Sequence, residues 1–178
     1  MVLFLYFYKK LKVMRKAFLL LSLFFIIFGF SKKEVSTTLN KEEKTELIKA
    51  HNKWRSEVGS PDIQWSEELA SKAQAWADHL AKSGCRMVHS KSDEGENIFW
   101  STYSATPTEV VDDWASEKKY FRYNKKGTRS FSRVGHYTQV VWKTTKLVGC
   151  GRATCKNGNE IWVCNYSPAG NWVGETPY

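Results

Sequence analysis

Two histidines and two glutamates are the side chains of this sequence best suited to metal binding or acid–base chemistry. His89, Glu96 and His136 each stand beside turn-forming residues, so all three are expected at the ends of loops that meet over a sheet. Glu117 instead follows Trp114 by three positions on a helical pattern, close to the apolar stripe. An unpaired carboxylate there would be costly, and we therefore expect Glu117 to have a partner.

Imidazoles with nearby carboxylates suit zinc, which makes His89 and His136 the candidate metal ligands. Two protein nitrogens leave coordination positions open, so weak and exchangeable binding is expected rather than a tight structural zinc. A hydrolytic site would use metal-activated water with Glu96 and Glu117 as cleft candidates, yet no serine or cysteine stands out as an activated nucleophile. The alternative is a hydrogen-bonded, charge-balanced cluster that only rigidifies the loops.

The elements that must position these groups follow from periodicity and capping signals. Three helices are predicted, from about residue 41 to Gly59, from the cap Ser66 to Gly84, and from Thr106-Pro107 onward. On these helices His51 is interpreted as a hydrogen-bonded core residue and His79 as a surface residue. Strands are expected around residues 86–89 and 97–102 and in a hairpin of 147–155 with 161–166.

Four cysteines predict two disulfides, for which three pairings exist. The Asn-Gly in residues 156–159 is a strong hairpin signal, and it would bring the strands that carry Cys155 and Cys164 together. This favours a Cys155–Cys164 bond and leaves Cys85 with Cys150. A metal site built from the four cysteines is the alternative, although no Cys-x-x-Cys spacing is present.

Residues 1–31 are predicted to be a signal peptide. Five basic and no acidic side chains accompany an apolar run at 17–30 that is short for a membrane span. Met14 is an alternative start, and an uncleaved membrane anchor is the competing interpretation. Residues 32–43 are expected to be flexible and 44–178 to form one domain, in a protein that is secreted, or periplasmic if bacterial.

The net charge of +9 mostly reflects this leader. Without residues 1–31, 22 basic side chains face 18 acidic ones, and the net charge is +4. Such a value is compatible with an anionic cell surface as a partner, but it argues against nucleic-acid binding. The densest basic stretch, residues 122–133, is predicted to be a solvated loop, with contact to an acidic partner as the alternative.

Several short motifs occur in order along the chain: His51-Asn52, Leu69-Ala70, His89-Ser90, Gly95-Glu96-Asn97-Ile98, Trp114-x-x-Glu117-Lys118, Gly135-His-Tyr-Thr-Gln-Val-Val-Trp142 and Cys164-Asn-Tyr-Ser-Pro-Ala-Gly-Asn-Trp172. From about Leu47 to Tyr178 the sequence resembles the CAP superfamily of cysteine-rich secretory, antigen 5 and pathogenesis-related 1 proteins. The closing residues look most like the plant pathogenesis-related 1 branch.

The resemblance implies an α+β fold, a three-layer α-β-α sandwich with a small central antiparallel sheet. It also implies a short helix at 137–142 and an open cleft in which His89, Glu96, Glu117 and His136 converge and the histidines bind zinc or another divalent cation. It implies the same two disulfides, without the third bond of many relatives, because Val134 stands at that position.

For function, the resemblance implies capture of a sterol or fatty acid, or action at a host or competitor surface. Phe99, Trp100 and Tyr103 are predicted to border the groove as lipid contacts. A metal-dependent hydrolase, a structural or protein-interaction domain, and a precursor whose tail at 168–178 is released as a defence-signalling peptide are the alternatives. A binding role is favoured over an enzymatic one, and no oligomeric state is predicted.

Overall fold

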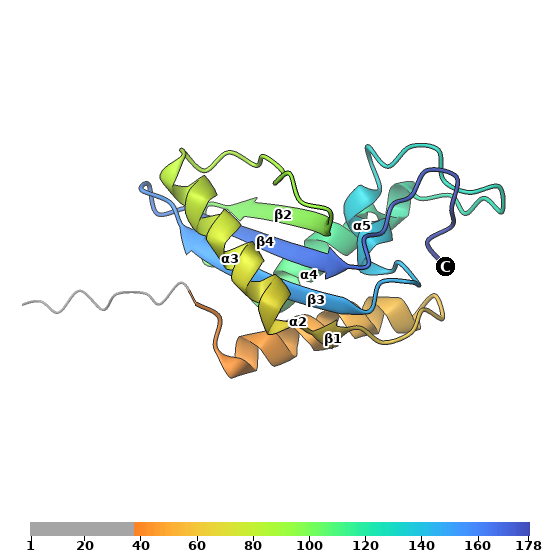
Figure 1. Ribbon diagram of the computed structural model, residues 1–178, viewed down its shortest axis with the longest axis horizontal. Coiled ribbons are helices and arrows are strands. Elements are labelled where there is room, and N and C mark those ends of the chain that lie inside the picture. The colour runs from red at the N-terminus through yellow and green to blue at the C-terminus, as the bar shows by residue number, and fades with distance from the viewer. Residues whose placement is uncertain (1–37) are drawn as a thin grey trace, which may run out of the picture. The chain divides into compact units, whose positions relative to one another are not determined.

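The computed structural model describes residues 38–178 (Figure 1). The predicted signal peptide, and residues 32–37 of the segment expected to be flexible, lie outside the described residues. Between Thr38 and Tyr178 a four-stranded sheet is covered by α3 on one face and by α2, α4 and α5 on the other. This is the predicted three-layer α-β-α sandwich.

The three predicted helices begin at the expected residues, two of them after the predicted caps. The first, α2 (Lys41–Ser56), is capped by Asn40 and starts three residues before the expected domain boundary at residue 44. Ser66 caps α3 (Glu67–Lys82), and Thr106 caps α4 (Pro107–Ala115) through a reciprocal bond with Glu109. A 3₁₀ turn, η1 (Ser116–Tyr120), follows α4, and the short helix implied by the resemblance is α5 (Gly135–Val140).

The sheet has the strand order β1-β3-β4-β2 and is mixed. β2 (Gly95–Ser101), β3 (Leu147–Thr154) and β4 (Glu160–Ser167) are antiparallel neighbours, whereas the two-residue β1 (Gln64–Trp65) pairs with β3 in parallel. The three longer strands form the expected small antiparallel sheet, and the two-residue β1, which was not predicted, adds a parallel edge to it. The strand predicted at 86–89 does not form, and Met87 and Val88 there are exposed.

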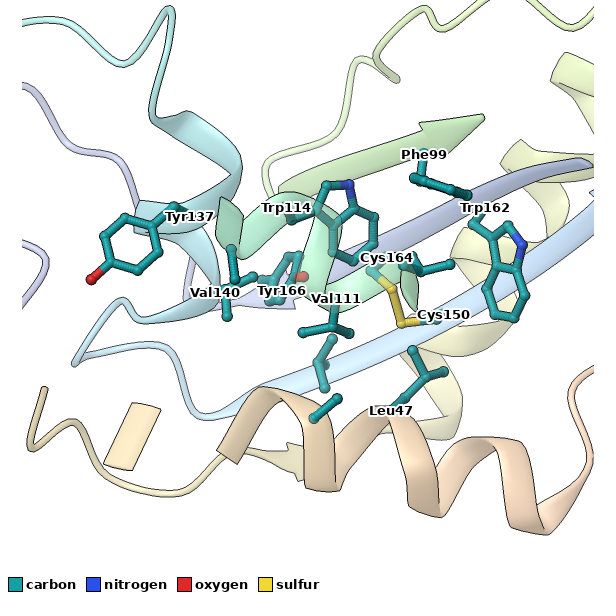
Figure 2. Packing of buried hydrophobic residues seen from close by; sticks show 14 of the residues in the cluster. Leu47, Phe99, Val111, Trp114, Tyr137, Val140, Cys150, Trp162, Cys164 and Tyr166 are labelled. Atoms are coloured by element: carbon teal, nitrogen blue, oxygen red, sulfur yellow. A yellow bond between two sulfur atoms is a disulfide. The ribbon is translucent and has the colours of Figure 1, made fainter. Parts of the chain in front are cut away.

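Alternate residues of β4 supply the two cores. Ile161 and Val163 face α3, whereas Trp162, Cys164 and Tyr166 pack into the larger core under α2 and α4. Figure 2 shows this larger core, with Trp162, Cys164 and Tyr166 among Leu47, Val111 and Trp114. β4 is therefore buried on both faces, and it lies between β3 and β2 in the sheet.

The close packing of α3 depends on two glycines of β3. A Cβ at Gly149 would collide with the backbone at Ala70, and a Cβ at Gly151 would collide with the backbone of Gln74. Only glycine admits such an approach. The helix presents small residues, Ala73 among them, to the same face of the sheet.

The two disulfides are Cys85–Cys155 and Cys150–Cys164, so the predicted pairing is wrong. The hairpin exists, but its register is decisive: the last cross-strand pair is Thr154 with Glu160, and counting back places Cys164 opposite Cys150. Their Cα atoms lie 4.1 Å apart, and Figure 2 shows the bond linking β3 to β4. Cys155 lies beyond the end of the strand and is free to reach Cys85 after α3.

Within the described residues 38–178, no helix has the length and apolar character needed to cross a membrane.

Candidate functional site

Glu117 has the partner that its half-buried position requires. Its Oε1 accepts a hydrogen bond from Nδ1 of His136 at 2.8 Å, and its Oε2 accepts from the backbone N–H groups of His136 and Tyr137 at 2.9 and 3.2 Å. Burial disfavours the charged carboxylate, but these hydrogen bonds outweigh burial and hold the pKa of Glu117 below its usual value. Glu117 on η1 thus anchors the first turn of α5, which carries His136.

A second pair repeats the arrangement from different elements. Nδ1 of His89, on the loop after α3, donates to Oε1 of Glu96 at 2.6 Å. Glu96, at the start of β2, also accepts from the backbone N–H and the hydroxyl of Ser90. The hydrogen bond to Glu96 raises the pKa of His89. The side chain of Glu96 is only 6% exposed, whereas that of His89 is 64% exposed, so the imidazole is the accessible member of the pair.

Both pairs line one cavity of about 250 Å³, which we call the His/Glu cleft. The four side chains predicted from the sequence are therefore brought together. Besides them, the cleft is lined by Asn97, Phe131, Ser132, Gly135 and Asn171. Most of these groups are polar, so the cleft is suited to a hydrated or charged ligand.

Both histidine rings direct Nδ1 to a carboxylate. A carboxylate only accepts hydrogen bonds, so Nδ1 of His89 and of His136 carries the proton. Among the described residues neither Nε2 atom makes a hydrogen bond. In the neutral rings each Nε2 is thus a free lone-pair donor, which is the tautomer that metal-binding histidines adopt when a carboxylate supports the other nitrogen.

The donor set fits a weakly held cation. Between Thr38 and Tyr178 no group of three or more histidine, cysteine, aspartate or glutamate side chains is arranged to hold a metal ion. Two imidazole nitrogens would leave the remaining coordination positions of zinc to water or to a ligand.

Arg55 of α2, to which the sequence assigned no role, holds the C-terminal end of α5 in place. This fully buried guanidinium donates to the backbone carbonyls of Val140 and Trp142 at 3.0 Å and of Thr145 at 2.9 Å. Burial lowers its pKa to about 10, so the group stays charged near neutral pH. Since no carboxylate within residues 38–178 forms an ion pair with it, Arg55 acts as a backbone clamp at the end of the helix that carries His136.

Asn171, known from the sequence only as part of the tail pattern, is also a cleft residue. Its amide donates to the carbonyl of Gly135 at 2.9 Å, and its Oδ1 accepts from the hydroxyl of Thr138 at 2.6 Å. It has a positive φ of 60°, a conformation that asparagine tolerates better than most residues. The tail thereby closes one side of the cleft against α5.

Asn97, although it lies within the recognised Gly-Glu-Asn motif, had no role assigned from the sequence. Its amide donates to the carbonyl of His136 at 3.2 Å and so links β2, which carries Glu96, to α5.

The predicted lipid contacts lie elsewhere. Phe99 is buried in the larger core, and Trp100 and Tyr103 are exposed near the other end of β2. None of the three lines the His/Glu cleft.

The remaining histidines take the expected structural positions. His51 is fully buried between the carbonyl of Leu47 and the hydroxyl of Tyr166, and His79 is exposed and stacked on Trp76.

Comparison with known proteins agrees with the motifs. A family model described as the cysteine-rich secretory protein family, CAP, matches residues 48–166. Pathogenesis-related protein 1C of Nicotiana tabacum is 37% identical over 139 residues, which cover 78% of this chain and 82% of the relative. Pathogenesis-related protein 1 of Arabidopsis thaliana is 37% identical over 138 residues, which cover 78% of this chain and 84% of the relative.

Solved structures share the fold. BmVAL-1 superposes with a TM-score of 0.69 at 27% identity over 81% of this chain and 85% of its own. A crystal structure of NaASP2 with Zn²⁺ gives a TM-score of 0.69 at 25% identity over 81% of this chain and 88% of its own.

Proposed function

This chain belongs to the CAP family of cysteine-rich secretory proteins, a family of defence type, and on that premise we propose that it is a secreted binding module. Its His/Glu cleft would take up a divalent cation, exchangeably, through His89 and His136. The observation that carries the proposal is the repeated pair: in each, a carboxylate fixes Nδ1 of an imidazole and leaves Nε2 free.

The cleft fits such a cation chemically. Carboxylates that orient metal-binding imidazoles raise the basicity of the ligand, and Glu96 and Glu117 are placed for that role. A bound zinc ion would supply a Lewis acid that polarises an oxygen ligand in its open coordination positions. The structure of NaASP2 with Zn²⁺ is a precedent for the metal on a related fold.

Binding is favoured over hydrolysis because neither carboxylate is free. Glu96 accepts hydrogen bonds from His89 and Ser90, and Glu117 accepts from His136 and Tyr137. A general base needs an oxygen within reach of a reacting water and a pKa near the working pH. The pKa of Glu117 is instead held low, which suits a positioning group.

A sterol or fatty acid would need a different surface, since polar side chains dominate the His/Glu cleft. The exposed rings of Trp100 and Tyr103 are the part of the predicted lipid contact that remains accessible. Secretion is supported by the leader-like pattern of residues 1–31 and by the two disulfides, which persist in oxidising compartments.

The packing of the tail argues against its release as a signalling peptide. Its pattern matches that of plant relatives, but the tail is packed into the fold. Lys143 N–H donates to the carbonyl of Pro177 at 2.7 Å, and Asn171 bridges to α5. Excision at Pro168 would remove these contacts, which favours a structural role for the tail.

Calorimetric titration with Zn²⁺ at neutral pH tests the proposal. The wild-type protein should bind one ion weakly, and His89→Gln and His136→Gln should each lower the affinity at least about tenfold, because each removes an imidazole nitrogen that would bind the metal. His79→Gln is the matched control, because His79 lies on the surface of α3 outside the cleft.

Unchanged zinc affinity in the His89→Gln/His136→Gln double variant would overturn the metal site. Zinc-dependent hydrolysis that disappears in Glu96→Gln while zinc affinity persists would instead favour the hydrolase.

A further inference from the structure

The loop between η1 and α5 encloses a second cavity of about 370 Å³, which we call the arginine pocket. The residues that line it include three arginines, Arg122, Arg129 and Arg133, and three hydroxyl-bearing residues, Thr128, Ser130 and Ser132. Among residues 38–178, no aspartate or glutamate lines it. The pocket is therefore rich in hydrogen-bond donors and positively charged.

Two of the three arginines are held in place without using a carboxylate. Arg122 donates from Nη1 to the carbonyls of Phe121 and Lys119 at 2.9 and 3.2 Å. The guanidinium carbon of Arg133 lies 4.5 Å from the centre of the Tyr120 ring. Arg129 makes no hydrogen bond or ion pair within residues 38–178. Most of the guanidinium donors thus remain available to a ligand.

Some basic side chains elsewhere on the described surface do have a counter-charge. Lys44 pairs with Glu67 at 2.8 Å, Lys72 pairs with Glu94 at 2.6 Å, and Arg152 pairs with Glu43 at 2.9 Å. Three unpaired cations around one cavity repel each other, and an anion placed among them would convert that repulsion into attraction.

The backbone of the loop that lines the pocket is fixed by the tail of the chain. Thr128 N–H donates to the carbonyl of Glu175 at 2.8 Å, and Gly174 N–H donates back to the carbonyl of Thr128 at 2.9 Å. Gly127 has a positive φ of 86° and lies so close to Gly174 that a Cβ would collide with it. The tail therefore holds the backbone of the basic loop at Thr128, while the basic side chains of residues 122–133 are exposed, as predicted for a solvated loop.

We infer that the arginine pocket is a binding site for a phosphate monoester. Planar guanidinium groups donate paired hydrogen bonds to phosphate oxygens, and hydroxyl donors complete the shell. Ser132 lines both this pocket and the His/Glu cleft, so a ligand longer than its phosphate would extend toward the cleft. The inference is independent of the proposed cation site.

The test uses two sources of the same chemistry. Backbone and arginine Nε–H NMR resonances are followed during titration with glycerol 3-phosphate, and flotation is measured with phosphatidylcholine vesicles with and without phosphatidic acid. Arg129→Gln and Arg133→Gln should each lower the affinity for the phosphate probe about tenfold or more, because each removes charge-assisted hydrogen bonds to the phosphate. Arg86→Gln is the control, because this exposed arginine on the loop after α3 removes the same charge outside the pocket.

Folding is monitored by the thermal midpoint. Arg129→Gln should leave that midpoint unchanged, since Arg129 makes no side-chain hydrogen bond or ion pair with residues 38–178. His89→Gln should retain phosphate binding, which separates this site from the cation site.

Saturable binding of glycerol 3-phosphate supports the inference and identifies a soluble ligand. Binding only to vesicles that contain phosphatidic acid supports it and identifies a lipid headgroup. An equal loss in Arg86→Gln, resonance shifts outside the pocket, or no binding of either probe would overturn it.

Discussion

His136 donates from Nδ1 to Oε1 of Glu117 at 2.8 Å, and its backbone N–H donates to the other carboxylate oxygen at 2.9 Å. One carboxylate thus fixes both the ring and the backbone of the same residue. The ring of His136 also stacks on Trp114, with centroids 6.5 Å apart. Glu117 is therefore the group that decides how His136 faces the cleft.

Glu117→Gln should lower the affinity for zinc about 10- to 100-fold while leaving both histidines present. The amide is neutral and less able to support the protonated Nδ1 of His136. Calorimetry measures the effect, with Glu94→Gln as the control, because Glu94 pairs with Lys72 outside the cleft. Equal affinities for the two variants would show that Glu117 does not support a metal ligand.

His51 makes stability depend on pH. Burial lowers its pKa from 6.5 to about 4, so between these values the unfolded chain takes up a proton that the folded chain does not. Its contribution is complete above pH 6.5 and is lost as the pH falls toward 4, by an amount on the order of 3 kcal/mol. Urea unfolding at several pH values should show this slope.

His51→Gln should be less stable than the wild type but should lose most of the slope between pH 5 and 6.5. The raised pKa of His89 acts in the opposite direction, since its contribution is present at low pH and disappears as the pH rises through the folded-state pKa. The side chain of His89 is largely exposed, so it should only reduce the pH slope that His51 produces. Parallel pH curves for the two proteins would contradict the assignment to His51.

The disulfide pairing can be mapped directly, because trypsin places each cysteine on its own peptide. Without reduction, residues 83–86 should be found linked to 153–156, and 147–152 linked to 157–178. A Cys85→Ala/Cys155→Ala variant should lose about 4 kcal/mol of unfolding free energy in the chain-entropy model, given the separation of 70 residues. A link between 153–156 and 157–178 would refute this pairing.

Asn171 tests how firmly the tail is held. Asn171→Gly keeps the positive φ but loses the bonds to Thr138 and Gly135, for an expected loss of about 1 to 3 kcal/mol. Asn171→Ala should lose about 1 kcal/mol more, because alanine is strained in that conformation. Thermal unfolding of the two variants separates the loss of the hydrogen bonds from the backbone strain. Equal stability of the wild type and both variants would show that the tail is not anchored at Asn171.

Local signals were enough to predict α2, α3 and α4, whereas α5 was expected only from the family resemblance. Ser66 and Thr106 are followed by α3 and α4 at the predicted residues, because a cap and the turn it satisfies lie within three or four positions of each other. The same reasoning found the hairpin and identified His51 as a core residue. The two histidines and two glutamates of the cleft were recognised from their motifs. The need of Glu117 for a partner followed from its expected burial alone.

What the sequence determined by itself was therefore local: where helices start, which faces are apolar, and which side chains carry chemistry. Tertiary structure decided which distant groups meet. Cys164 joins Cys150 because of hairpin register, Arg55 clamps the end of α5, and Asn171 enters the cleft from the tail. These pairings depend on how layers pack over long separations, since a shift of a few residues in register changes every partner without changing any local pattern.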